Sequence, residues 1–413
     1  MSTLVLWVAL TREMAKRTEI GRNFLSECGR EGDAMQVDVK RVEGSKSRYF
    51  QGFYLLPSWI HEGNDCWVPW FLGDVKELVD KKHPLFEHTS GEFLVATRDD
   101  RVLGRIFVFE NGRYNETHKM KSAHFYFFDS IDDREVADRL LQAAVDWAKG
   151  RNLELLFGPM GLGGVTGGGL LIEGYDHRAA MTMMMYNPPH YRELLEGFGF
   201  QKYLDNYSFY LPTTARLPAD FKEPVDAILR EGKYRVLEFR SKKDLAKVAD
   251  EVGKVFIKTL GDHAGNYFLS EKEVARLTKN LIQIANPELV KVIAHKEKVV
   301  GFLLGFHDLS AAIQKSKGKL NPLSMYRLMR EYKKSDWLLI NGLGILPEHQ
   351  GSGANLLLYA EVENVVKTYK QFKHLEMVQI QETTAKMLSN VETLQGKTHK
   401  IHRMYQMPLQ ERF

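Results

Sequence analysis

The chain has 413 residues, a net charge of +4 and two cysteines, Cys28 and Cys66. Its length suggests roughly two or three domains, and so small a charge gives no reason to expect DNA as the main partner. Two cysteines can build neither a disulfide framework nor a zinc site, so we expect a cytoplasmic protein without a bound metal. The apolar run 4–10 is too short to span a membrane, and no longer apolar run occurs later in the chain.

The first half of the chain alternates strand and helix patterns. Residues 1–34 join poorly to the strand pattern that begins at residue 37, so we interpret them as a peripheral N-terminal extension and place the first domain at 35–212. Period-two and apolar runs predict strands at 37–42, 92–97, 102–110, 123–128, 153–157 and 207–211. Helical periodicity predicts helices at 46–60, 133–149 and 191–196.

A second series of elements comes after a linker at 213–224, and it repeats the order of the first. Its predicted strands are 236–239, 290–294, 299–306, 337–345, 376–380 and 402–407. Its predicted helices are 242–259, 270–284, one that starts after residue 355, and 384–394, with a basic, polar insertion at 314–334. The repeated order indicates a tandem duplication, although the halves share little residue identity.

The stretch from Trp337 to Tyr369 carries the strongest functional pattern. An apolar strand stops at Pro347, the turn Gln350–Asn355 holds two glycines, and an amphipathic helix comes next. A helix N-terminus behind a glycine turn offers unpaired N–H groups and a positive dipole end, which suits a phosphate or pyrophosphate. The alternative is a plain strand-to-helix turn in which glycine supplies a positive φ.

These residues resemble a known family. Ile345-Leu346-Pro347 followed by Gln350-x-x-Gly353 is similar to the pyrophosphate-binding motif of the GNAT (GCN5-related) N-acyltransferases, although Asn355 stands where that motif has a small residue. The element order in both halves is also that of GNAT proteins. The resemblance implies an α+β fold of two tandem GNAT-like domains, each a mixed, mostly antiparallel sheet flanked by helices, with the intact cofactor site at 225–413.

The resemblance further implies acetyl-CoA or a longer acyl-CoA as co-substrate, without a metal. Backbone groups of the cradle would hold its diphosphate, and the strand before it would hold the pantetheine arm. The implied binding residues are Gly344, Ile345, Leu346, Gln350, Gly351, Ser352, Gly353, Ala354, Asn355 and Thr384. Thr384 lies where many GNAT enzymes carry an asparagine.

The first half differs at the equivalent turn, which reads Phe128-Asp129-Ser130-Ile131-Asp132-Asp133. Three carboxylates would repel a diphosphate, so we expect a degenerate first domain. Asp132 and Asp133 can instead cap the helix that begins after them. This half also carries a glycine-rich stretch, 158–169, that predicts either a close approach to a ligand or a flexible loop.

A methionine cluster, Met181 and Met183–Met185, suits either an acyl-chain pocket or the core. With Trp67–Trp70, His83-Pro84 and Gly158-Pro159, it resembles bacterial proteins made of two GNAT-like halves. Some of those are ceramide-synthase-like N-acyltransferases of sphingolipid synthesis. That resemblance implies a long-chain or sphingoid-type amine as acceptor and, with a lipid acceptor, peripheral membrane contact.

The implied reaction is direct attack of an amine on a thioester, which needs a base and an acid but no covalent enzyme intermediate. Candidate catalytic residues are Glu376, Glu382, His402 and Tyr405. Each has a structural alternative as a helix cap or packed sheet residue. Many GNAT enzymes carry a tyrosine that acts as general acid on the helix equivalent to 384–394. This helix contains no tyrosine here. Asp262, His263 and Tyr267 can line an acceptor site or be solvated loop residues.

Three classes of function are consistent with these patterns. The first is an acyl-CoA-dependent N-acyltransferase. The second is a catalytically inactive acyl-CoA-binding or regulatory protein, suggested by Asn355 and the missing tyrosine. The third is an aminoacyl-tRNA-dependent transferase, whose support is the basic insertion around 315–334. The pattern predicts no oligomeric state.

Overall fold

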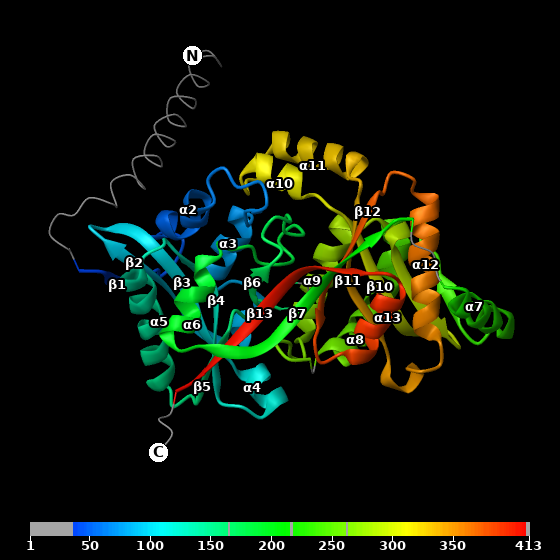
Figure 1. Ribbon diagram of the computed structural model, residues 1–413, viewed down its shortest axis with the longest axis horizontal. Coiled ribbons are helices and arrows are strands. Elements are labelled where there is room, and N and C mark those ends of the chain that lie inside the picture. Colours follow the sequence, from blue (N-terminus) through cyan, green and yellow to red (C-terminus); the bar gives the residue numbers. More distant parts are fainter. Residues whose placement is uncertain (1–35, 164–165, 215–217, 262, 410–413) are drawn as a thin grey trace, which may run out of the picture.

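Both halves of the chain contribute strands to one 13-stranded sheet with helices on its two faces (Figure 1). The computed structural model describes residues 36–163, 166–214, 218–261 and 263–409. The N-terminal extension expected at 1–34 lies outside the described residues. None of the described helices is both long and apolar enough to cross a membrane.

The first half supplies seven strands and five α-helices within the described residues. Its strands are β1 (Asp38–Arg41), β2 (Thr89–Arg98), β3 (Arg101–Asn111), β4 (Ser122–Ser130), β5 (Leu155–Gly158), β6 (Leu170–Glu173) and β7 (Gln201–Pro212). Its helices are α2 (Phe50–Ile60), α3 (Leu72–Val79), α4 (Gly112–His118), α5 (Arg134–Lys149) and α6 (His190–Phe198). The sequence pattern misses α3, α4 and β6, which are short.

The second half repeats this order with longer helices. Its strands are β8 (Arg235–Leu237), β9 (Val290–His295), β10 (Lys298–His307), β11 (Trp337–Ile345), β12 (His374–Gln381) and β13 (Lys397–Pro408). Its helices are α7 (Ala219–Glu231), α8 (Lys242–Leu260), α9 (Glu271–Ile284), α10 (Ser310–Ser316), α11 (Pro322–Lys334), α12 (Ala354–Thr368) and α13 (Ala385–Thr393). The basic insertion is therefore helical.

The last six residues of the expected linker at 213–224, residues 219–224, belong to α7. Pro224 suggests a break, yet it lies inside the helix. Val225 is buried and Ile228 packs against the core, and this burial offsets the hydrogen bond that a proline cannot donate.

Side-chain alternation along the strands gives the sheet two cores. On β3, Phe107 and Phe109 face the cluster that contains Phe53 of α2, whereas Ile106 and Val108 face the cluster that contains Leu140 of α5. Successive side chains of a strand point to opposite faces, so α2 and α5 cover opposite sides of the sheet.

The two halves exchange their last strands. Along the sheet the order is β1-β2-β3-β4-β5-β13-β7-β12-β11-β10-β9-β8, so β13 lies between β5 and β7, and β7 lies between β13 and β12. Tyr405 of β13 pairs with Gly158, and Tyr207 of β7 pairs with Ile380. Neither half therefore completes its sheet alone, and the division into domains at 35–212 and 225–413 stays a proposal.

Candidate functional site

Strands β11 and β12 are paired at one end and separated at the other. Their parallel register runs from Trp337, opposite His374, to Ile340, opposite Met377. Beyond that point β11 continues along β10, and β12 continues along β7. A wedge-shaped gap must therefore open between the carboxyl ends of two neighbouring strands.

A cavity of about 640 Å³ fills this gap. Its walls are β11, β12, the start of α13, one side of α12, the loop after α8, and the glycine loop of the first half. Polar lining side chains are Thr166, Asn206, Thr259, His263, Asn266, Asn341, Gln350, Asn355, Tyr359, Gln379, Gln381, Thr383, Thr384, Lys386 and Asn390. No Asp or Glu lines it among the described residues.

A β-bulge in β11 lies at the mouth of the gap. The register with β10 shifts between Leu303 and Gly305, so Asn341 and Gly342 together oppose Leu304, and Gly342 has a φ of +119°. A bulge takes backbone groups out of the regular ladder. Since both residues line the cavity, backbone groups of β11 are placed to reach a ligand there.

The first half has the same bulge but fills the space. Its register between β3 and β4 shifts at the equivalent point, and Phe127, with a φ of +52°, stands where the second half has Asn341. The Phe127 ring lies 5.1 Å from the Trp70 ring and 6.0 Å from the Phe53 ring, measured between centroids. Aromatic side chains thus occupy the position that is open in the second half.

The turn before α12 has the geometry of an anion cradle. Gly351 and Gly353 have φ values of +75° and +83°, and Gly353 is the N-cap of α12. No side chain caps this helix, so its first N–H groups remain for a ligand. The Gln350 side chain donates to the Ile345 carbonyl oxygen at 3.1 Å, which ties the turn to the end of β11.

The equivalent helix of the first half is closed to an anion. The carboxylate of Asp133 accepts hydrogen bonds from the backbone N–H groups of Glu135 at 2.9 Å and Val136 at 3.3 Å. Asp133 is therefore the N-cap of α5, as the sequence predicts, and its carboxylate lies where a bound anion would lie in the second half. Asp129 forms a buried ion pair with Arg105 at 2.6 Å.

Six of the ten predicted cofactor residues line the cavity, and the other four support its wall. The lining residues are Gly344, Ile345, Gln350, Gly351, Asn355 and Thr384. Leu346 and Ala354 are buried, and the Ser352 hydroxyl donates to the His349 carbonyl oxygen at 2.6 Å. A Cβ atom on Gly353 would lie 2.4 Å from Ile228 Cδ1, so this glycine permits α7 to pack on the turn.

The two candidate glutamates are engaged away from the cavity. Glu376 is buried and pairs with the Lys400 ammonium, whose Nζ lies 2.8 Å from Glu376 Oε1, and burial raises the pKa of this carboxyl. Glu382 accepts from Lys202 at 2.8 Å and from the Asp205 N–H at 3.1 Å. Neither side chain lines the cavity.

The other two candidates belong to the exchanged strand β13 and point into protein. The His402 ring donates from Nε2 to the Met185 carbonyl oxygen at 2.9 Å, and burial lowers its pKa to about 4. The Tyr405 hydroxyl donates to Glu196 at 3.0 Å, and it packs in the first half's core. Neither lines the cavity, so a role for any of the four in proton transfer gains no support from position.

Besides Lys386, two titratable side chains among the described residues line the cavity, and neither is among the predicted candidates for the base or the acid. Tyr359 lies on α12, and its hydroxyl is 3.2 Å from Met387 Sδ and 3.3 Å from Asn390 Nδ2, both on α13. Burial raises the pKa of Tyr359, so its hydroxyl is protonated at neutral pH. His263 lines the cavity from the loop after α8, as one reading of the sequence expects. Tyr267 instead donates to buried Glu273 at 2.6 Å, and Asp262 lies outside the described residues.

The signal for Tyr359 is its helical position, since it comes one turn after Asn355 and must face the same side of α12. A search for a tyrosine on the helix 384–394 alone misses Tyr359, because Tyr359 belongs to α12 and only its hydroxyl reaches α13.

The glycine loop of the first half forms part of the second half's cavity. Thr166, Gly167 and Gly168 line it, and Gln379 Nε2 donates to the Gly168 carbonyl oxygen at 2.9 Å. A Cβ atom on Gly167 would lie 2.7 Å from the Met183 carbonyl oxygen, so glycine is needed for this close approach. The nearby methionines 181, 183 and 184 are buried in the core, which favours their packing role.

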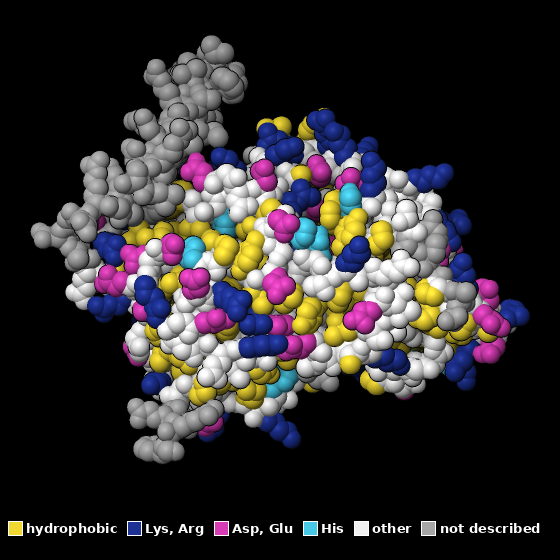
Figure 2. All heavy atoms as spheres, viewed as in Figure 1, with side chains coloured by type: hydrophobic (Ala, Val, Ile, Leu, Met, Phe, Trp, Pro, Cys, Tyr) yellow, Lys and Arg dark blue, Asp and Glu magenta, His cyan; other side chains and the backbone are white. Residues whose placement is uncertain are grey.

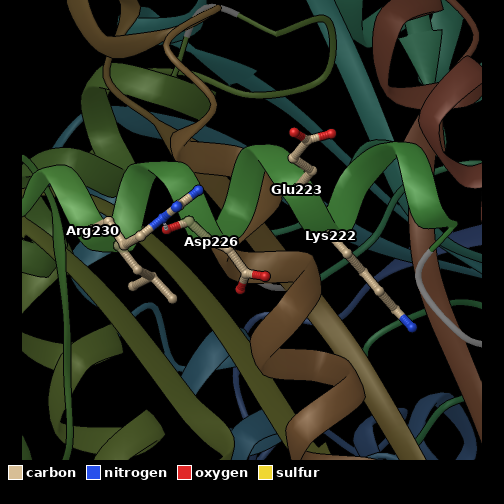
Figure 3. Close-up of a pocket in the computed structure, with 5 residues that line it drawn as sticks. Lys222, Glu223, Asp226 and Arg230 are labelled. Atoms are coloured by element: carbon tan, nitrogen blue, oxygen red, sulfur yellow. Dashed lines mark hydrogen bonds between the residues drawn. The ribbon is translucent and has the colours of Figure 1, made fainter.

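A second hollow, of about 770 Å³, lies along α7 and is open to solvent. Its five lining residues, Lys222, Glu223, Asp226, Leu229 and Arg230, all belong to this one helix. Figure 3 shows Lys222 and Glu223 leaving the helix in opposite directions, so no groups converge on a ligand. Among the described residues, no cluster of His, Cys, Asp and Glu is arranged to hold a metal ion.

Comparison with known proteins gives two curated relatives. The chain is 24% identical over 389 residues to "Bacterial ceramide synthase" of Caulobacter vibrioides, which covers 91% of this chain and 99% of that protein. It is 23% identical over 362 residues to "Protein YghO" of Escherichia coli, covering 86% of this chain and 92% of that protein. No model of a known protein family matches the sequence.

Solved structures identify the fold. A tandem GNAT protein from the clavulanic acid biosynthesis pathway superposes with a TM-score of 0.52 at 12% identity, over 92% of this chain and 100% of that one. A GCN5-related glucosamine N-acetyltransferase region of a fungal β-N-acetylglucosaminidase gives a TM-score of 0.51 at 9% identity, over 92% of this chain and 39% of that one. The expected fold of two tandem GNAT-like halves is confirmed.

Proposed function

We propose that this protein is an N-acyltransferase that moves an acyl group from acyl-CoA to an amine. One observation carries the proposal: the cavity between the separating ends of β11 and β12 leads to an uncapped glycine turn at the start of α12. The similarity to a protein named bacterial ceramide synthase supports acyl transfer as the class of reaction.

The two ends of the cavity suit the two ends of acyl-CoA. The diphosphate would lie on the N–H groups of the turn 350–355, where the positive end of α12 favours an anion. The extended pantetheine arm would run along β11 past Gly344 toward the bulge at Gly342, where backbone groups leave the ladder. In that order the thioester would lie between the bulge, Tyr359 and His263.

The reaction can proceed by direct attack. The amine nitrogen forms a bond to the thioester carbonyl carbon, and backbone N–H groups at the bulge stabilise the oxyanion that develops. We assign His263 as the base that takes the proton from the amine, because no described Asp or Glu lines the cavity. We assign Tyr359 as the acid that protonates the departing thiolate.

Apolar side chains also line the cavity. Met377, Val378, Ile380, Met387 and Met404 line it, and such side chains adapt to hydrocarbon chains. With the similarity to the ceramide synthase, this lining supports a long-chain amine as acceptor. The first alternative is a regulatory protein that binds acyl-CoA in this cavity but catalyses no transfer. The second is a transferase that takes its acyl group from an aminoacyl-tRNA bound in the same cavity.

The test is acyl transfer followed by mass spectrometry. The full chain is incubated with acetyl-CoA or palmitoyl-CoA and a panel that includes sphinganine, spermidine and a lysine peptide. The proposal expects an amide product and free CoA in equal amounts with at least one acceptor. The same chain with Gly351→Glu, which adds a carboxylate at a cavity-lining position with open space for a Cβ atom, should give none. CoA binding without any product would favour the regulatory alternative.

A further inference from the structure

The helix α11 carries an exposed surface that mixes apolar and basic side chains. Eight large hydrophobic residues are strongly exposed in the described chain, and five of them lie between residues 320 and 329. These five are Leu320, Leu323, Met325, Tyr326 and Met329, with 50% to 64% of their surface exposed. Such a concentration marks a contact surface, because exposed apolar residues are otherwise scattered.

Helical spacing places these side chains together. Leu323, Tyr326 and Met329 recur every third residue and share one side of α11, while Ser324 is buried and Leu328 packs against the core on the other. Between residues 315 and 334 the chain has seven Lys or Arg residues and one acid, Glu331. Figure 2 shows dark blue and yellow side chains side by side along the upper edge, where Figure 1 places α10 and α11.

Local contacts anchor α11 at both of its ends and to α10. A capping box between Asn321 and Ser324 fixes the start of α11. Arg327 Nη1 donates to the Lys315 carbonyl oxygen at 2.8 Å, which ties α11 to α10. Near the end, the rings of Tyr332 and His307 lie 4.3 Å apart.

We propose that this surface docks the protein on an anionic phospholipid bilayer. A helix lying in the membrane interface needs apolar side chains that enter the acyl boundary and basic side chains that meet the headgroups, and α11 presents both on its free side. A second copy of the chain is a poor fit, because the same basic residues would face each other. A nucleic acid would use the basic residues and leave the leucine and methionines in water.

The test is vesicle flotation with the full chain, and it is independent of the proposed acyl transfer. The protein should bind vesicles of equal parts phosphatidylcholine and phosphatidylglycerol, should bind pure phosphatidylcholine weakly, and should lose affinity as salt is raised. The apolar variant Leu323→Ser, Tyr326→Ser, Met329→Ser should bind at least about 10-fold more weakly. The charge variant Arg330→Gln, Lys333→Gln, Lys334→Gln should lose about 100-fold, because each basic residue near an anionic surface contributes about a factor of five.

The matched control is Leu229→Ser with Ile284→Ser, which removes exposed apolar side chains elsewhere and should bind as the unaltered protein does. Urea unfolding of every variant separates lost docking from lost folding. No flotation of the full chain with the phosphatidylglycerol vesicles overturns the proposal, as does unchanged binding of a folded apolar variant. Binding to tRNA without binding to vesicles also overturns it and assigns the surface to nucleic acid.

Discussion

Glu273 of the second half lies 2.9 Å from His88 of the first, measured from the carboxylate Oε2 to the ring Nε2. The same carboxylate accepts from the Tyr267 hydroxyl at 2.6 Å and from the Ser270 N–H at 2.8 Å. Burial by itself raises the pKa of Glu273, but these hydrogen bonds outweigh it and lower the pKa to about 2. The contact thus joins the halves through a buried charge.

This carboxylate should make stability depend on pH. Its folded pKa of about 2 lies below its ordinary value of 4.5, so its contribution is present above pH 4.5 and is lost as the pH falls toward 2. At pH 7, Glu273→Gln should lower the free energy of unfolding by about 2 kcal/mol, while glutamine still caps α9. Urea unfolding from pH 7 to pH 2.5 should show the two proteins converging. The exposed Glu271→Gln on the same turn should show no such trend.

Gly353→Ala should weaken acyl-CoA binding as well as the fold. Alanine at a φ of +83° costs about 1–2 kcal/mol, and its Cβ would press on Ile228. Gly232→Ala is the matched control, because Gly232 has a φ of +64°, ends α7 and has open space for a Cβ. Urea unfolding should show a loss for both variants, larger for Gly353→Ala because of its contact with Ile228, whereas calorimetry should show weaker acyl-CoA binding for Gly353→Ala alone. Equal affinities would remove Gly353 from the cradle.

Tyr359→Phe should lower kcat by about 100-fold or more with little change in KM, because only proton donation to the thiolate is lost. Tyr369→Phe is the control, since Tyr369 lies just past the end of the same helix and its hydroxyl contacts Glu288. The measurement is kcat and KM of both variants, from steady-state kinetics with an acyl-CoA. An unchanged kcat in the Tyr359 variant would mean that the thiolate leaves without this acid.

His263→Asn should abolish the acid limb of the kcat/KM profile, because that limb reports protonation of the base in the free enzyme. The variant keeps a polar side chain in the cavity wall, so acyl-CoA affinity should stay close to that of the unaltered protein. The measurement is kcat/KM between pH 5 and pH 9. A variant with full activity and an unchanged acid limb would show that another group takes the proton.

The pair formed by Lys400 and Glu376 should be the costliest to break. Lys400 lies on β13 and Glu376 on β12, with β7 between them, and both side chains are buried. Lys400→Met alone leaves a buried carboxylate unpaired and should cost about 3–5 kcal/mol. The double variant Lys400→Met, Glu376→Leu should recover most of that loss in urea unfolding. If the double variant is as unstable as the single one, the charge pair is not the cause.

Local patterns in the sequence are enough to predict most of the elements and the glycine turn before α12. The strand from Trp337 to Ile345 and its glycine turn are defined by residues close in sequence, and the structure has them there. Asp133 as a helix cap can be predicted from the same local chemistry.

Local patterns cannot predict which strands pair with the last strand of each half. Both β7 and β13 alternate as any half-buried strand does, and nothing in that alternation specifies that they cross to the other half. His402 and Tyr405 were candidates because β13 was expected beside the cavity of its own half, whereas the exchange turns them toward the first half. The contribution of Gly167 and Gly168 to the second half's cavity is a long-range contact of the same kind.

The central claim is that the cavity between β11 and β12 binds acyl-CoA through the turn at Gly353. Isothermal titration calorimetry of the full chain with acetyl-CoA and palmitoyl-CoA tests it most directly, with Gly351→Glu in the same turn as the comparison. We expect saturable binding of one acyl-CoA per chain that the substitution abolishes while the variant still unfolds cooperatively. No binding heat at millimolar ligand, or equal binding by both proteins, would contradict the claim.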